Sequence, residues 1–118
     1  MRVVVLLAAM ALSGCSDQPS EHEMRRMLLQ QAAFPGCENA KVRFTGRSLG
    51  GGWQGGTIDV RIDGTGPCME AWRGRLAALT TCQHVGRHFV CHAPDERTGA
   101  GIQFQGANTA AVTLWSIT

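Results

Sequence analysis

Hydrophobic and polar positions alternate along the chain with two different periods, and the first clear period predicts a helix. Ser20 is followed three residues later by Glu23, which matches a capping box at a helix N-terminus. Apolar side chains then recur every three to four residues, at Met24, Met27, Leu28 and Ala32. We expect this helix to end near residues 34–36, where proline and glycine follow phenylalanine.

A period of two predicts the next two elements as strands. Val42 and Phe44 alternate with polar neighbours, and residues 58–62 alternate most clearly, with isoleucine or valine at every second position. Residues 46–56 lie between them and are rich in glycine, which predicts a loop.

A helical period returns after Gly64. Pro67 suits the first turn of a helix, where its missing N–H has no partner to lose. The apolar positions that follow at helical spacing are Met69, Trp72, Leu76 and Leu79. Gly74 weakens this second amphipathic helix.

Residues 80–92 predict a β-hairpin. Gly86-Arg87 fits a two-residue type II′ turn, which needs glycine at its first position. The register counted from this turn places Cys82 opposite Cys91 at a non-hydrogen-bonded pair. Two last strands are expected near residues 101–105 and 110–117, joined around Gly106.

These elements predict one α+β domain with the order α-β-β-α-β-β-β. Short connections favour antiparallel pairing, so we expect a small antiparallel sheet with two helices on one face and two disulfides. The 118 residues suffice for a single domain, which we place at residues 20–118.

The N-terminus carries a different kind of segment. Met1-Arg2 begins an apolar run over residues 3–12, which is too short to span a bilayer and fits the core of a secretory signal. The run ends in Leu12-Ser13-Gly14-Cys15, which resembles the lipobox of bacterial lipoproteins. The resemblance implies a signal peptide over residues 1–14, cleavage after Gly14, and lipidation of Cys15 with diacylglycerol and acyl chains such as palmitate.

Acyl chains on Cys15 would anchor the mature chain to a membrane, with residues 15–19 as a tether. Ser16 follows the cysteine. In enteric bacteria, lipoproteins with Asp at this position resemble inner-membrane residents. We therefore expect a periplasm-facing domain in the cell envelope, on the outer membrane rather than the inner.

The lipobox also accounts for an odd number of cysteines. Of the five, Cys15 would be lipidated, which leaves four for two disulfides in an oxidising compartment. The hairpin register pairs Cys82 with Cys91, and elimination then pairs Cys37 with Cys68. A zinc site is the alternative, and export argues against it.

Charge and motifs exclude several function classes. The formal net charge is +2, and removal of Arg2 with the signal peptide lowers it to +1, so the chain offers no electrostatic case for nucleic-acid binding. The sequence has no catalytic serine motif and no tyrosine, and we expect no free thiol, so little is left to support catalysis. We expect the adjacent side chains of Asp95 and Glu96 to be solvated in a loop. We expect no enzymatic activity and no cofactor.

Trp53 is the candidate partner contact. It lies in Gly50-Gly51-Gly52-Trp53-Gln54-Gly55, which matches G-x-G-x-x-G in letters but precedes a strand, so a nucleotide site is not expected. Trp53 either folds onto the core or stands exposed as an anchor for a partner.

Three histidines, His84, His88 and His92, are spaced four apart, which would align them on a helix. The hairpin register instead places His84 on the face opposite to the other two, and about 13 Å separates those two along a strand. We therefore expect no metal site.

Taken together, the sequence predicts a membrane-anchored lipoprotein that acts by binding a protein, as an accessory or assembly factor. The alternatives are an inhibitor or immunity-type protein, which would use the 46–56 loop, and a binder of a metal or small ligand. For the accessory, we expect an apolar patch or an exposed sheet edge, for which the C-terminal strand is the candidate.

Overall fold

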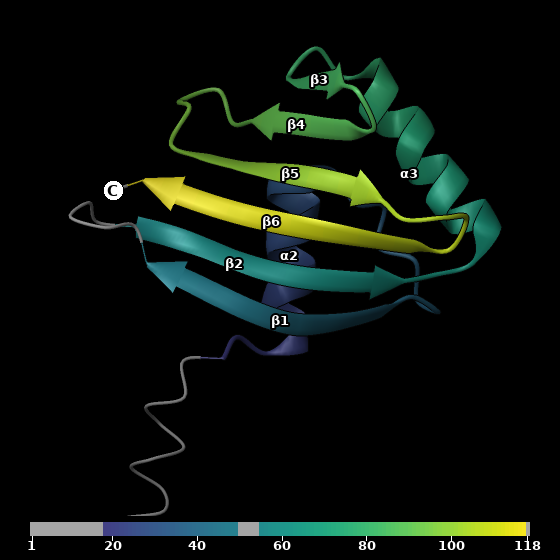
Figure 1. Ribbon diagram of the computed structural model, residues 1–118, viewed down its shortest axis with the longest axis horizontal. Coiled ribbons are helices and arrows are strands. Elements are labelled where there is room, and N and C mark those ends of the chain that lie inside the picture. Colours follow the sequence, from purple (N-terminus) through teal and green to yellow (C-terminus); the bar gives the residue numbers. More distant parts are fainter. Residues whose placement is uncertain (1–17, 50–54, 118) are drawn as a thin grey trace, which may run out of the picture.

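The computed structural model describes residues 18–49 and 55–117, which form an antiparallel six-stranded sheet with two helices on one face (Figure 1). The predicted α+β fold class is confirmed. Four strands follow the second helix, namely the two of the predicted hairpin and the two last strands, so the order α-β-β-α-β-β-β is one strand short. The elements are α2 (Glu21–Ala32), β1 (Lys41–Leu49), β2 (Gly55–Asp63), α3 (Gly66–Ala78), β3 (Cys82–Val85), β4 (His88–His92), β5 (Thr98–Phe104) and β6 (Thr109–Ile117).

The strands are ordered β1-β2-β6-β5-β4-β3, so the C-terminal strand lies in the middle of the sheet. The interpretation of β6 as an exposed edge is wrong, because it pairs along its length with β2 and with β5. The edges are β1 and β3. None of the helices in the described part of the chain is long and apolar enough to cross a membrane.

The first two strands are longer than the sequence pattern predicts. β1 continues past an irregularity between Phe44 and Gly46 to pair Leu49 with Gly56. The predicted loop over residues 46–56 is therefore too long at both ends. The two strands continue to pair through their backbones at positions where apolar and polar side chains no longer alternate.

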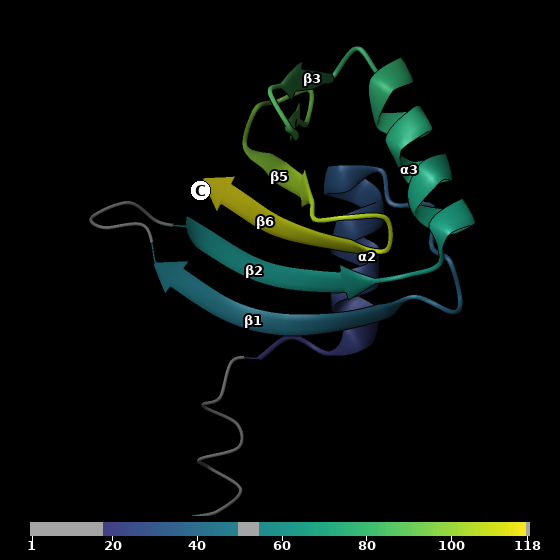
Figure 2. The same cartoon turned by 45° about the vertical axis from the view of Figure 1, so that its right-hand side comes forward.

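Helix α2 is fixed at both ends. The predicted capping box is present: the Ser20 hydroxyl accepts a hydrogen bond from the Glu23 N–H, and the Glu23 carboxylate accepts one from the Ser20 N–H. The helix ends at Ala32, slightly before the predicted point, because Ala33 adopts a left-handed conformation. Its buried side chains are Met24, Leu28 and Ala32, and α2 crosses the strands behind the sheet (Figures 1 and 2).

Helix α3 begins at Gly66, where the Thr65 hydroxyl accepts a hydrogen bond from the Cys68 N–H. Its buried residues include Met69, Trp72 and Leu76, as the helical period predicts. Leu79 is 38% exposed, contrary to the predicted apolar face, because the helix has ended by then and Leu79 adopts an extended backbone.

Trp72 is the centre of the core. Its side chain is fully buried and contacts Phe34 and Phe104 edge-to-face, with ring centroids 4.9 and 5.1 Å away. The indole Nε1 donates a hydrogen bond of 2.9 Å to the carbonyl oxygen of Ala32 at the end of α2. One side chain of α3 therefore satisfies a free carbonyl of α2 and packs against β5.

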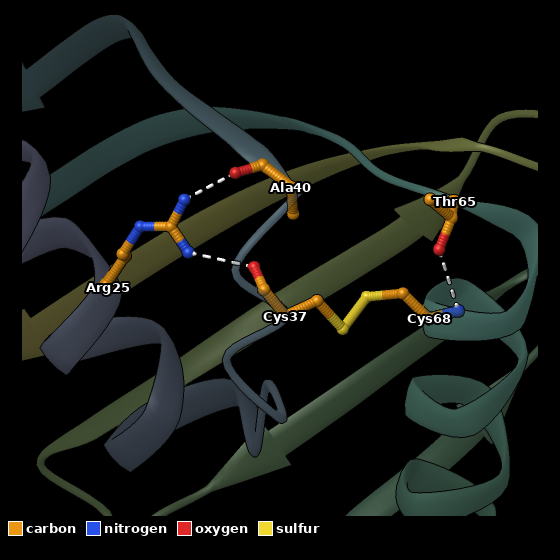
Figure 3. The surroundings of a disulfide bond; sticks show 5 residues. All are labelled: Arg25, Cys37, Ala40, Thr65 and Cys68. Carbon is orange, nitrogen blue, oxygen red and sulfur yellow. Dashed lines mark hydrogen bonds between the residues drawn. A yellow bond between two sulfur atoms is a disulfide. The ribbon is translucent and has the colours of Figure 1, made fainter.

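The Cys37–Cys68 disulfide forms a second link between the same parts of the fold (Figure 3). It joins the segment that precedes β1 to the first turn of α3. Arg25 of α2 donates hydrogen bonds to the carbonyl oxygens of Cys37 and Ala40, which orders that segment. The pairing predicted by elimination is confirmed.

The second disulfide, Cys82–Cys91, lies across the β3–β4 hairpin. The predicted register is confirmed, with Cys82 opposite Cys91 and Val85 opposite His88. Gly86 has a φ of 62°, as the first position of the predicted turn requires.

We predict that Trp72→Phe lowers the free energy of unfolding by about 2–3 kcal/mol, through lost packing and an unpaired Ala32 carbonyl. Trp115→Phe, at a half-buried tryptophan of β6, is the matched control and should cost about 1 kcal/mol or less. Urea unfolding followed by circular dichroism without reductant measures both. Equal losses in the two variants would contradict the central position of Trp72.

Candidate functional site

The open face of the sheet is the surface that the helices leave uncovered. Side chains of a strand alternate between the two faces, and the buried ones, such as Val60, Ile102 and Val112, point toward α2. The other set points away from both helices. The pairing places the strands' open-face positions in rows, one of which is Asp59, Thr113, Gly101 and Val90.

The half of this face on β1 and β2 is charged. Asp63 lies 3.6 Å from Arg43 and 3.3 Å from Arg61, and it accepts a 3.0 Å hydrogen bond from Thr109. Asp59 accepts a hydrogen bond from Thr113. Arg43, Asp59 and Arg61 lie on the same face of the sheet, because Arg43 pairs with Arg61 and Asp59 is two residues from Arg61 on β2.

The charge balance at Asp63 follows from these contacts. Burial raises the pKa of Asp63, but the hydrogen bonds from Thr109 and Arg61 and the nearby charges of Arg61 and Arg43 outweigh it, so the pKa lies below its usual value. The carboxylate therefore stays charged near neutral pH. Such exposed ion pairs contribute about 0–1 kcal/mol each, so this half is a solvated surface.

The half on β3 to β6 carries no carboxylate, lysine or arginine. We name it the uncharged surface. Its members are Gln83, Val85, His88, Val90, His92, Gly99, Gly101, Gln103, Ala111, Thr113 and Trp115.

Two aromatic rings meet on the uncharged surface above Gly99. Gly99 lies opposite His92 on one side and opposite Trp115 on the other. The rings of His92 and Trp115 are 5.5 Å apart at an angle of 66°. A Cβ on Gly99 would overlap the Trp115 indole and the carbonyl oxygen of Cys91. Glycine is therefore the residue that allows Trp115 to lie against the backbone.

Next to this pair, the surface has an accessible stretch of backbone at Gly101 and then a hollow. A Cβ on Gly101 would meet no atom within 4 Å, so the backbone there is open to an approaching molecule. Beyond His92, a hollow of about 340 Å³ lies at the base of the hairpin, lined by Thr80, Thr81, Gln83, His92, Ala93, Pro94 and Glu96.

The histidines do not converge. His84 lies opposite Phe89 on the helix-covered face, and His88 and His92 lie on the open face, as the hairpin register predicts. Within residues 18–49 and 55–117, no three histidine, cysteine or acidic side chains form a group that could hold a metal ion.

Two candidates from the sequence, Cys15 and Trp53, lie outside the described residues. The four other cysteines form the two disulfides. Trp115 was not singled out by the sequence pattern. The available signal is its position: Val112 and Leu114 point into the core, so Trp115 is a large apolar side chain at an outward position of the same strand.

Comparisons with protein-family models, with curated proteins and with solved structures find no match to the chain.

We predict that Gly99→Ala lowers the free energy of unfolding by about 1–3 kcal/mol, because both the Trp115 indole and the backbone at Cys91 must shift to make room for the methyl group. Gly101→Ala, two residues along the same strand, adds a methyl group to open space and should change stability by less than about 1 kcal/mol. Urea unfolding of both variants measures the difference. Equal effects would show that Trp115 does not lie on Gly99.

Proposed function

We propose that this protein is an exported lipoprotein, anchored through Cys15, whose domain binds a protein partner with its uncharged surface. The lipobox residues Leu12-Ser13-Gly14-Cys15 support the anchor. The disulfide pairing of the other four cysteines supports export, because disulfides persist in oxidising compartments. The outer membrane, facing the periplasm, is the proposed location.

The observation that carries the binding role is a sheet face that neither described helix covers and that carries no carboxylate, lysine or arginine on β3 to β6. The cores of protein interfaces are depleted of charged residues and enriched in aromatic ones. Trp115 supplies a large rigid contact beside the accessible backbone of Gly101. Tryptophan is frequent among the residues that dominate binding energy.

The position of the anchor is compatible with this role. The described chain begins beside β1, at the sheet edge opposite to β3 (Figure 1). From β1 to β3 there are five strand spacings, or about 24 Å. The uncharged surface therefore extends away from the edge at which the tether joins, so a partner can reach it without contact with lipid.

The accessory role is the first candidate, because the uncharged surface combines the Trp115 ring with accessible backbone at Gly101. The inhibitor role would use Trp53. Identification of the partner distinguishes the two roles, because a partner that is an enzyme acting on the envelope would favour the inhibitor role.

We predict that Cys15→Ser leaves an uncleaved precursor without lipid, because the serine hydroxyl cannot form the thioether. Intact mass and incorporation of labelled palmitate measure this. Ser16→Ala keeps the cysteine and should be processed like the parent. Normal cleavage and acylation of Cys15→Ser would refute the lipoprotein assignment.

We predict that Gly101→Arg abolishes capture of the partner, because it places a charge at the centre of the uncharged surface. Gln30→Arg places the same charge on an exposed position of α2 and should capture as the parent does. Affinity purification from cross-linked membranes, with quantitative mass spectrometry, compares the three proteins. A partner recovered equally with all three does not bind at this surface.

A further inference from the structure

A second hollow lies on the opposite, helix-covered side of the sheet, between α3 and the β3–β4 hairpin. Its volume is about 340 Å³, and it is lined by Arg73, His84, Gly86, Arg87, Phe89 and Phe104. The proposed function does not use it.

The floor of this hollow is aromatic. Phe89 and Phe104 meet edge-to-face, with ring centroids 6.1 Å apart. The His84 imidazole stacks on Phe89 at 4.6 Å, with the two ring planes within 7° of parallel. The stacking holds His84 at the rim, where its ring remains exposed to solvent. His84 covers one face of Phe89 and Arg73 lies over Phe104, so an apolar group that enters would contact those parts of the two phenylalanine rings that line the hollow.

The rim is cationic, and neither of its two arginines is paired with a carboxylate of the described residues. Arg73 lies 4.6 Å over the Phe104 ring and donates a hydrogen bond of 3.1 Å to the carbonyl oxygen of Gly106. Arg87 is exposed at the hairpin turn. Neither guanidinium forms an ion pair with a carboxylate of the described residues, and no described lining residue is acidic.

Two contacts hold Arg73 in place before any ligand binds. A guanidinium has five N–H donors, and the bond to Gly106 uses one of them. The remaining donors can bind a carboxylate, and binding loses less side-chain entropy because the arginine is already ordered. Charge-assisted bonds from arginine to carboxylate are among the stronger hydrogen bonds in proteins.

We propose that this hollow binds a carboxylate attached to a compact apolar group. The arginines would hold the carboxylate, and Phe89 and Phe104 would contact the apolar group. The volume is at the small end for ligand sites, which fits one residue or a small organic acid. Such a group is present both at the C-terminus of a polypeptide that ends in an apolar residue and in a free small acid.

The experiment uses two probes that differ only in charge. N-acetylphenylalanine and N-acetylphenylalaninamide are titrated into the full-length chain in neutral detergent, with two-dimensional NMR of the hairpin amides. We expect the acid to bind at least about tenfold more tightly than the amide, the ratio that corresponds to about 1.4 kcal/mol. Arg87→Gln should weaken binding of the acid, and Arg73→Gln should weaken it further.

Arg26→Gln, at an exposed arginine of α2, is the control and should bind as the parent does. Equal binding of acid and amide, or unchanged binding by both Arg73→Gln and Arg87→Gln, would overturn the proposal. A peptide, acetyl-Gly-Gly-Gly-Phe with a free C-terminus, separates the two sources: tighter binding than the single residue assigns a polypeptide C-terminus, and equal binding assigns a small acid. This result is independent of partner capture at the uncharged surface.

Discussion

The hydrogen bond from the Trp72 indole to the carbonyl oxygen of Ala32 is the interaction on which the rest of the structure depends. It joins the end of α2 to the middle of α3 inside the core, where the loss of a buried hydrogen bond is costly. The Cys37–Cys68 disulfide joins the same two regions by a covalent link. A small domain buries a limited share of its surface, so these two links add substantially to the packing of buried side chains, such as Leu28 and Leu76, that holds the helices on the sheet.

Both helices are thereby held on one face, and the consequence is an open face on the other. On that face the charged side chains gather on β1 and β2, where Asp63 joins Arg43, Arg61 and Thr109. The strands β3 to β6 are left without charge. Glycine at position 99 lets Trp115 lie against the backbone, and glycine at position 101 leaves open space above it. The same fold thus provides a rigid scaffold and a surface suited to a partner.

Features that depend on neighbours along the chain could be predicted from the sequence. The capping box at Ser20 and the register of the β3–β4 hairpin follow from local rules, and the register gave the disulfide pairing. Features that depend on distant pairing could not be predicted. The pairing of β6 with β2 and the meeting of Trp115 with His92 join strands that are not consecutive in the sequence. The candidate site on the open face is made of such contacts, which is why the sequence pattern alone does not point to Trp115.

The central claim is that the uncharged surface contacts a protein partner, and site-specific photo-cross-linking in living cells tests it most directly. A photoreactive amino acid at Gln103, an exposed position on the open face of β5, probes this surface. The same group at Gln30, exposed on α2, probes the opposite side. The account predicts one discrete cross-linked product from position 103 and none from position 30. The same products from both positions, or a product from position 30 alone, would contradict it.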